Sequence, residues 1–383
     1  MTGVMTLMHD GKAFSKESVV ANASKFGFVN PHAVELFLWD IELAAQLQAC
    51  SNDVVLKGGA AAQLFIPVER QRGSRDVDLS TDLDPKALEE LTKQLGSQMR
   101  QVKFEYYKPN SPKPNLNLIT YYAETNSVTQ PQPVRVKIDF LLHDLRLPTT
   151  EVRDVETFAV RTCNLRCFTP EVLVGDKILT LAKESIGLKE TADYPKQIYD
   201  LSMLVTSPQF HNFEEVTTAI EKITPVEAKI AGCKVDHTEA LEHVIRFVDG
   251  VLAPIDTSQG SQEMKTGVKS FEQFFAPASQ KVTLQEWSAR ALRIGFVARL
   301  AQQRLKGILS SQDCESLLAK AGSLESRLGN MKGNEIEQVR TRLLSLQKTP
   351  LSYPRGELRG KSLRRVLWQV VYPHNLDQID RLC

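Results

Sequence analysis

The sequence has 383 residues, of which 42% are hydrophobic and 24% charged, with a formal net charge of +1 at pH 7. These values are typical of a globular chain with about two or three domains, and they exclude a protein that binds nucleic acid through overall positive charge. No apolar run reaches the roughly 18 residues of a membrane span, and Met1–Lys12 lacks a secretory signal pattern, which predicts a cytoplasmic protein.

Helical and strand patterns alternate over the first 160 residues. Apolar spacing predicts a helix at 31–49, and a short apolar run predicts a strand at 53–56 that enters a tight turn at Gly58-Gly59. The Pro-rich stretch 109–114 is predicted to be a loop. The remaining elements predicted here are a helix at 60–65, a strand at 77–79, a helix from Pro85 through Leu95, and strands at 102–107, 116–122 and 134–142.

The rest of the chain is predicted to be mostly helical. Thr169-Pro170-Glu171 is typical of a helix start and predicts a helix to about residue 184, followed by a second helix at 196–205. The tail, 354–383, is predicted to be basic at first and irregular. Helical spacing fills most of 212–347, with breaks near 254–267 and 329–333.

Acidic side chains indicate the chemistry of the first domain. Asp76 and Asp78 are two residues apart on a strand, so their carboxylates leave the same face, where they repel unless a cation joins them. Asp139 is the only acid on the polar face of strand 134–142, and the three carboxylates converge if that strand pairs beside 77–79. Such a triad can hold two divalent cations about 4 Å apart, and Mg²⁺ prefers oxygen ligands of this kind.

These features also have simpler interpretations. Asp76 and Asp78 could lie on a solvated strand edge, and the glycine pair before them could be an ordinary turn. Asp139 could be a strand-end charge that pairs with Arg135 or Lys137. The residues alone leave both interpretations open.

A set of motifs in a fixed order resembles one known family. The motifs are Leu56-Lys-Gly-Gly59, Arg72-Gly-Ser-Arg-Asp76-Val-Asp78-Leu79, a strand with the single Asp139, Pro170-Glu-Val-Leu173 followed by Lys177, and Ile198-Tyr-Asp200-Leu201. Their order resembles the AbiEii/AbiGii group of nucleotidyltransferase toxins, which includes the MenT-type toxins and belongs to the DNA polymerase beta-like superfamily. The resemblance implies an α+β protein, with a mixed-sheet nucleotidyltransferase core at 1–160 and an α-helical domain at 161–383.

The resemblance also implies a role for each of these positions. Asp76, Asp78 and Asp139 would bind Mg²⁺ or Mn²⁺, with Asp139 as third ligand or general base. Asp200 would position Lys177 or the nucleotide. The residues implied to contact the NTP are Lys57, Gly58, Gly59, Arg72, Ser74 and Lys177.

The implied reaction transfers a nucleoside monophosphate from an NTP to a hydroxyl group and releases pyrophosphate. For MenT-type relatives the acceptor is the 3′ end of tRNA, and the toxin has an antitoxin encoded nearby. Three positions depart from the family pattern, because Ala60 replaces a Thr or Ser, Lys196 replaces an Arg and Gln197 replaces an Asp. These departures leave two alternatives open: transfer to a small molecule or a protein hydroxyl, or a relative that binds a nucleotide or partner without catalysis.

The second domain has simpler interpretations too. Lys177 could extend from an amphipathic helix to solvent, and Asp200 could be an acid on a helix surface. The arginines within 290–304 and the basic residues within 355–365 could be solvated faces or a track for an RNA backbone.

Overall fold

The computed structural model describes residues 7–99, 101–107, 117–143, 145–161, 164–332, 334–346 and 360–382. The chain divides into two compact units. The first contains Met1–Leu173 and Ser270–Lys281, and the second contains Val174–Lys269 and Val282–Cys383. No helix within the described ranges is long and apolar enough to cross a membrane. The loop predicted at 109–114 lies outside the described residues.

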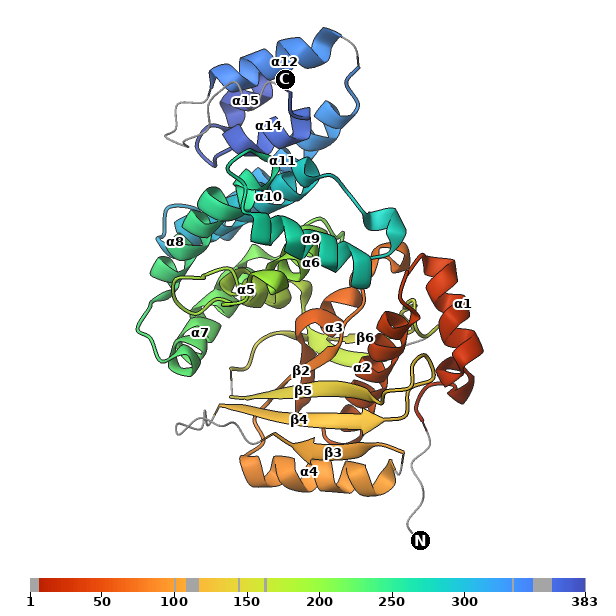
Figure 1. Ribbon diagram of the computed structural model, residues 1–383. Coiled ribbons are helices and arrows are strands. Elements are labelled where there is room, and N and C mark those ends of the chain that lie inside the picture. Colours follow the sequence, from red (N-terminus) through yellow and green to blue (C-terminus); the bar gives the residue numbers. More distant parts are fainter. Residues whose placement is uncertain are drawn as a thin grey trace. The chain divides into compact units, whose positions relative to one another are not determined.

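A seven-stranded mixed sheet forms the centre of the first unit, in the order β3-β4-β5-β2-β1-β7-β6 (Figure 1). The five predicted strands are confirmed as β1 to β5. The last two strands were not predicted, because their pairing in the sheet, rather than a local pattern, reveals them. The strands are β1 (Val54–Lys57), β2 (Asp76–Thr81), β3 (Lys103–Tyr106), β4 (Leu118–Thr125), β5 (Val134–Leu142), β6 (Thr149–Val152) and β7 (Leu165–Phe168).

Helices pack on this sheet because their apolar sides need a partner surface. α2 begins at a cap in which the Asn30 side chain accepts a hydrogen bond from the His32 N–H, and Pro31 occupies its first turn. α2 packs against β1, β2, β5 and β7, and α4 packs against β3 and α2. The helices are α1 (Lys16–Phe26), α2 (Pro31–Cys50), α3 (Gly58–Gln63) and α4 (Pro85–Gln98).

Glu35 joins α2 to the loop between β4 and β5. The residue is 1% exposed. Although burial opposes ionisation, hydrogen bonds lower the pKa of Glu35 from 4.5 to about 2. The donors are the His32 ring at 3.3 Å, the Thr129 hydroxyl, the Val128 N–H at 2.6 Å and the Ser127 hydroxyl at 2.7 Å.

We therefore expect an acid-sensitive contribution to stability from Glu35. A lowered pKa in the folded state stabilises the fold above the unfolded value of 4.5, and this contribution disappears as the pH falls towards about 2. Its size corresponds to about 3 kcal/mol. Glu35→Gln should lose that amount at pH 6 and much less at pH 3, measured by urea unfolding. Glu17→Gln, at an exposed position of α1, is the control; an equal loss at both pH values would contradict the prediction.

The second unit is helical, as predicted. α10 lies at its centre and packs against α6, α7, α8, α11 and α14. A π-helical turn at Val248–Leu252 and a 3-10 turn at Ala253–Asp256 follow α8. α5 and α9 cross the division between the units. The helices from α5 onward are α5 (Pro170–Leu179), α6 (Tyr194–Leu204), α7 (Phe213–Ala231), α8 (His237–Phe247), α9 (Gln262–Phe274), α10 (Leu284–Leu305), α11 (Ser311–Gly329), α12 (Asn334–Ser345), α14 (Leu363–Val370) and α15 (Leu376–Leu382).

The helix predicted from Pro170 to about residue 184 is shorter than expected and ends at Leu179. The Thr180 hydroxyl donates to the Lys177 carbonyl at 2.6 Å, and the Leu188 N–H donates to the Thr180 carbonyl at 2.9 Å. These bonds turn the chain back on itself instead of continuing the helical ladder.

The arginines of α10 are held by acids of their own unit. Arg290 and Arg293 are 6% and 4% exposed. A guanidinium that is buried and bound to a carboxylate inside the unit is not available to an RNA backbone, so both predicted alternatives, a solvated face and an RNA track, are wrong for Arg290 and Arg293. The pairs are Arg290 with Glu286, Arg293 with Glu325, Arg299 with Asp249 and Arg304 with Glu214.

The prediction of an irregular tail is wrong for its described part. Ser362 caps α14 by accepting a hydrogen bond from the Arg365 N–H. Arg365 is fully buried, donates to the Gln369 side chain at 2.7 Å and lies 3.4 Å from the Asp256 carboxylate. The apolar side of α14 is buried as well, which fixes this short helix in the unit. The basic positions before residue 360 lie outside the described ranges.

Candidate active site

A glycine turn brings the end of β1 against Asp78. Gly58 adopts a left-handed backbone conformation with φ +70°, and a Cβ atom there would lie 1.9 Å from Asp78 Oδ2. Lys57 is the register partner of Asp78 across β1 and β2. Only glycine allows the carboxylate to approach the backbone so closely at this conformation.

Gly58→Ala should therefore disturb the site itself. The left-handed conformation costs a residue with a Cβ about 1–2 kcal/mol, and the new methyl group displaces the Asp78 carboxylate. We expect about a hundredfold loss of nucleotidyl transfer, the effect of misplacing a reacting group by about 1 Å. Gly96→Ala in α4 is the matched control, since its Cβ would meet only Phe104 at 3.5 Å. Full activity in a folded Gly58→Ala variant would contradict the prediction.

β2 and β5 place the three predicted acids on one face of the sheet. In the parallel register, Asp78 is opposite Asp139 and Asp76 is opposite Lys137. The Thr120 hydroxyl on β4 donates to Asp139 Oδ1 at 2.6 Å, and Lys137 Nζ lies 2.5 Å from Asp139 Oδ2. The predicted pairing of the two strands is confirmed, and the alternative contact between Asp139 and Lys137 is present as well.

The acids of this face suit a hard cation, although they do not enclose one. Among the described residues, no three His, Cys, Asp or Glu side chains form a group that could hold a metal ion. Mg²⁺ needs only one or two carboxylates in addition to water and substrate phosphates, so a closed protein cage is not required. Lys137 lies among these carboxylates. Burial alone would lower the pKa of Lys137, but the charges of Asp139, Asp76 and Asp78 outweigh burial and raise it. The face therefore attracts positive charge.

A fourth carboxylate, Asp40 on α2, was not predicted as a site residue. It is fully buried, and neither of its carboxylate oxygens has a hydrogen-bond partner among the described residues. Burial and the negative charges of Asp76 and Asp78 raise the pKa of Asp40 well above its usual value, against the opposing influence of Ser74 and Arg72. A raised pKa favours the neutral form of this carboxyl, so Asp40 adds little negative charge at the start of β2.

The segment before β2 is held rigidly within the first unit. The Arg72 N–H donates to the Gln63 side chain at 2.8 Å, and Arg72 Nη1 donates to the Gly73 carbonyl at 2.7 Å. The Gly73 N–H donates to the Phe275 carbonyl at 2.8 Å, which joins 270–281 to this loop. Arg72 is 3% exposed, and its Nη2 atom would lie 2.9 Å from a Cβ at Gly59. The guanidinium is thus fixed behind the glycine turn.

Lys177 and Asp200 form a buried ion pair in the second unit. Lys177 Nζ lies 2.9 Å from Asp200 Oδ2, and the two side chains are 3% and 0% exposed. Lys177 also donates to the Gln197 side chain at 3.2 Å. The alternatives of a solvent-directed lysine and a surface acid are therefore wrong. Gln197, which departs from the family pattern, accepts a hydrogen bond from the same ammonium group.

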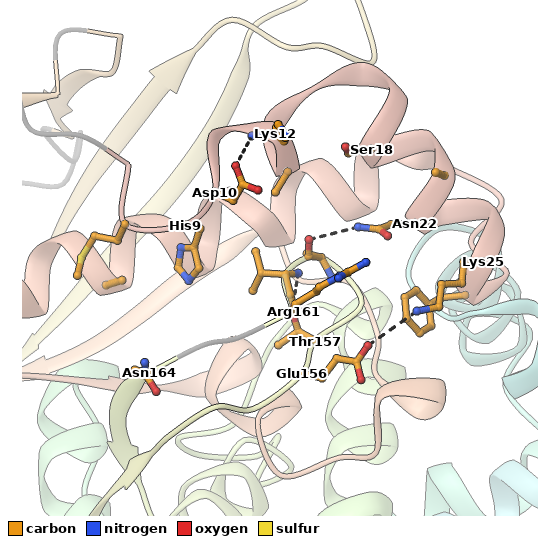
Figure 2. Close-up of a pocket in the computed structure, with 17 residues that line it drawn as sticks. His9, Asp10, Lys12, Ser18, Asn22, Lys25, Glu156, Thr157, Arg161 and Asn164 are labelled. Carbon is orange, nitrogen blue, oxygen red and sulfur yellow. Dashed lines mark hydrogen bonds and ion pairs between the residues drawn. The ribbon is translucent and has the colours of Figure 1, made fainter.

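A separate pocket of the first unit, with a volume of about 640 Å³, contains none of the predicted site residues (Figure 2). The N-terminal segment, α1 and residues of the 156–164 stretch line it. His9 Nδ1 lies 2.7 Å from the buried Glu42 carboxylate, and Lys25 lies 3.8 Å from Glu156. The lining carries the bases Lys12, Lys25 and Arg161 and the acids Asp10 and Glu156, so it lacks a row of carboxylates like the one on β2 and β5.

A glycine turn followed by acids on one face of adjacent strands is the arrangement expected of a nucleotidyltransferase core. Residues 43–298 match the family described as AbiEii, a nucleotidyl transferase toxin of type IV toxin–antitoxin systems. The match covers more than half of the chain, and the chain belongs to this family. It is therefore a nucleotidyltransferase-family enzyme, and membership implies an NTP substrate and a cognate antitoxin. No curated protein matches the sequence.

Several solved structures are similar to this chain at low sequence identity. MenT4, a nucleotidyltransferase toxin from Mycobacterium tuberculosis, is 15% identical, with 80% of this chain and 98% of that chain covered and a TM-score of 0.41. JHP933 from Helicobacter pylori is 12% identical, with 78% and 95% covered and a TM-score of 0.38. An antigenic nucleotidyltransferase-like protein from Paracoccidioides brasiliensis is 18% identical, with 52% and 95% covered and a TM-score of 0.34.

Proposed function

We propose that this protein transfers a nucleoside monophosphate from an NTP to the 3′ end of tRNA and releases pyrophosphate. The observation that supports the proposal best is the register of β2 and β5, which sets Asp78 opposite Asp139 beside the glycine turn. Two carboxylates on neighbouring strands suit a divalent cation that an NTP brings with it.

In this proposal Asp76, Asp78 and Asp139 hold Mg²⁺ or Mn²⁺. The bound cation would neutralise charge on the triphosphate and orient it for attack. Asp139 would also take the proton of the attacking hydroxyl through Oδ2, the oxygen that Lys137 contacts in this structure, since the Thr120 hydroxyl is bound to Oδ1. Lys137, whose side chain is 39% exposed, can withdraw towards solvent when the nucleotide arrives.

The phosphate-binding roles remain proposals for residues of both units. Lys57, Gly58 and Gly59 would line the approach of the triphosphate, with Arg72 and Ser74 behind them. Lys177 would contact the phosphates, and Asp200 would keep that lysine charged and in place, since a buried ammonium needs a partner. Catalysis by such a site consists mainly of positioning and electrostatic stabilisation.

An acceptor screen tests the proposal directly. The purified protein is incubated with Mg²⁺ and each α-labelled NTP in the presence of total tRNA, cell protein or small-molecule hydroxyl compounds, and the products are resolved on a denaturing gel and by thin-layer chromatography. We expect label in tRNA, removable by a 3′ exonuclease. Label confined to protein or to a small molecule would identify that molecule, instead of tRNA, as the acceptor. Nucleotide binding without pyrophosphate release would favour a non-catalytic relative.

A further inference from the structure

The face that carries the acids continues across β4 and β3 as an aromatic surface. Thr120 on β4 reaches Asp139, so Thr120 points to the acid face. Tyr122, two residues further along the same strand, points to that face as well, because side chains alternate along a strand. The Tyr107 N–H donates to the Thr120 carbonyl at 2.9 Å, which continues the β3–β4 register and places Tyr107 opposite Thr120.

Tyr107, Tyr122 and Arg135 form one continuous cluster on this face. The rings of Tyr107 and Tyr122 meet edge to face, with their centroids 5.8 Å apart. The Arg135 guanidinium lies over the Tyr122 ring, 3.9 Å from its centroid. Tyr107 is 46% exposed, Arg135 is exposed too, and Tyr122 between them is partly exposed. Exposed aromatic rings beside an arginine are the surface on which unpaired bases stack, with the cation left for the backbone phosphates.

We infer that Tyr107, Tyr122 and Arg135 bind the single-stranded 3′ end of the acceptor RNA. The role of this RNA as the acceptor of the reaction rests on the proposed function, whereas its binding to this face does not. Tyr122 is the diagonal neighbour of Asp139 across β4 and β5, a separation of about 7–8 Å. A base stacked on Tyr122 therefore leaves the terminal ribose within reach of the acids.

The charges of this face suit a short unpaired end better than a long duplex. Arg135 and Lys137 on β5 and Lys103 on β3 are cationic, while Glu105 and Glu124 share the face with them. Counted with Asp76, Asp78 and Asp139, the acids of this face outnumber its cations, so stacking rather than phosphate neutralisation would supply most of the affinity.

The same strand supplies a matched control. Tyr106 is 47% exposed, almost the same as Tyr107, but it points to the opposite face, where its ring packs against Tyr121, 5.5 Å away. Residues of α4, including Glu89 and Lys93, line the pocket on that side together with Tyr106. Loss of this tyrosine removes a similar ring without touching the acid face.

The test measures binding of a short single-stranded RNA, labelled with 2-aminopurine at its 3′ end, to the full chain without NTP. Anisotropy gives the dissociation constant, and 2-aminopurine quenching reports stacking. Tyr122→Ala and Tyr107→Ala should each weaken binding about tenfold and reduce quenching, whereas Tyr122→Phe and Tyr106→Ala should bind like the wild type. Thermal midpoints verify that each variant is folded.

The inference would be overturned if Tyr122→Ala and Tyr107→Ala both bound RNA as tightly as the wild type, or if Tyr106→Ala weakened RNA binding by the same factor. The face would then be left to another partner, such as an antitoxin. The transfer assay separates this outcome from failure of the proposed function. Tyr122→Ala should raise the KM for RNA and leave kcat nearly unchanged. If no protein in the series labels RNA but RNA binding still depends on Tyr122, the RNA-binding role of the Tyr107, Tyr122 and Arg135 cluster is supported and the proposed reaction is wrong.

Discussion

Asp78→Ala should reduce nucleotidyl transfer about a thousandfold or more while the protein stays folded. Asp78 is opposite Asp139 on the central strands and lies against Gly58, so its loss removes one of the two cross-strand carboxylates proposed to hold the cation. Loss of several kcal/mol of charge stabilisation in the transition state corresponds to a decrease of this size. The measurement is the initial rate of α-labelled nucleotide incorporation at saturating NTP and Mg²⁺.

Asp82→Ala is the matched control for Asp78→Ala. Asp82 is exposed and follows the last residue of β2, so the substitution removes a similar charge close in the sequence without altering the acid face. It should retain wild-type turnover. Comparable thermal midpoints for the two variants establish that any difference lies in the reaction. A folded Asp78→Ala variant with unchanged turnover would remove the basis for the proposed site.

Lys177→Met should destabilise the second unit by about 3–5 kcal/mol, because it leaves the Asp200 carboxylate buried without its ammonium partner. Lys177 and Asp200 are 3% and 0% exposed and 2.9 Å apart. The free energy of unfolding, from urea titration followed by tryptophan fluorescence, measures this loss. The more exposed ion pair Lys196–Asp193, whose side chains are 14% and 32% exposed, is the comparison. Lys196→Met should lower the free energy of unfolding by about 1 kcal/mol or less.

A double substitution separates the structural role of Lys177 from its proposed role with phosphates. Lys177→Met combined with Asp200→Leu removes both charges, and such replacements restore much or all of the stability that a single substitution loses. If Lys177 contacts the NTP, the double variant should be stable and still lack transfer activity. Recovery of activity along with stability would show that the pair serves folding alone.

The sequence was most informative where a pattern had enough residues to repeat. β5 carries alternating apolar and polar residues over nine positions, and its predicted bounds, Val134–Leu142, agree with the structure. α2 likewise has a clear cap and apolar spacing, and it begins at Pro31 as predicted. β6 and β7 have four residues each, and their existence depends on pairing partners that no local pattern records.

The candidate site could be predicted only as far as local spacing reaches. The two-residue spacing of Asp76 and Asp78 fixes their common face, whereas the choice between Arg135 and Lys137 as the partner of Asp139 needs the actual side-chain positions. Asp40 was missed, although an acid among apolar helix positions such as Phe37 and Ile41 is itself a signal of a buried charge.

The clusters of arginine were misjudged for a related reason. Two of their acidic partners are distant in the sequence: Glu325 binds Arg293, and Glu214 binds Arg304. Charge counted along one helix cannot reveal a partner on another helix. Net charge near a segment is therefore a weak guide to an RNA surface, and aromatic residues on the acid face provide a more specific one.

Cation binding tests the proposed site most directly, because it does not depend on the acceptor. Isothermal titration of Mn²⁺ into the full-length protein, with a non-hydrolysable NTP present, measures it. We predict that the wild type and Asp82→Ala bind Mn²⁺ alike, and that Asp78→Ala and Asp139→Ala bind at least tenfold more weakly. Equal Mn²⁺ affinity in all four proteins would contradict a cation site formed by the acids of β2 and β5.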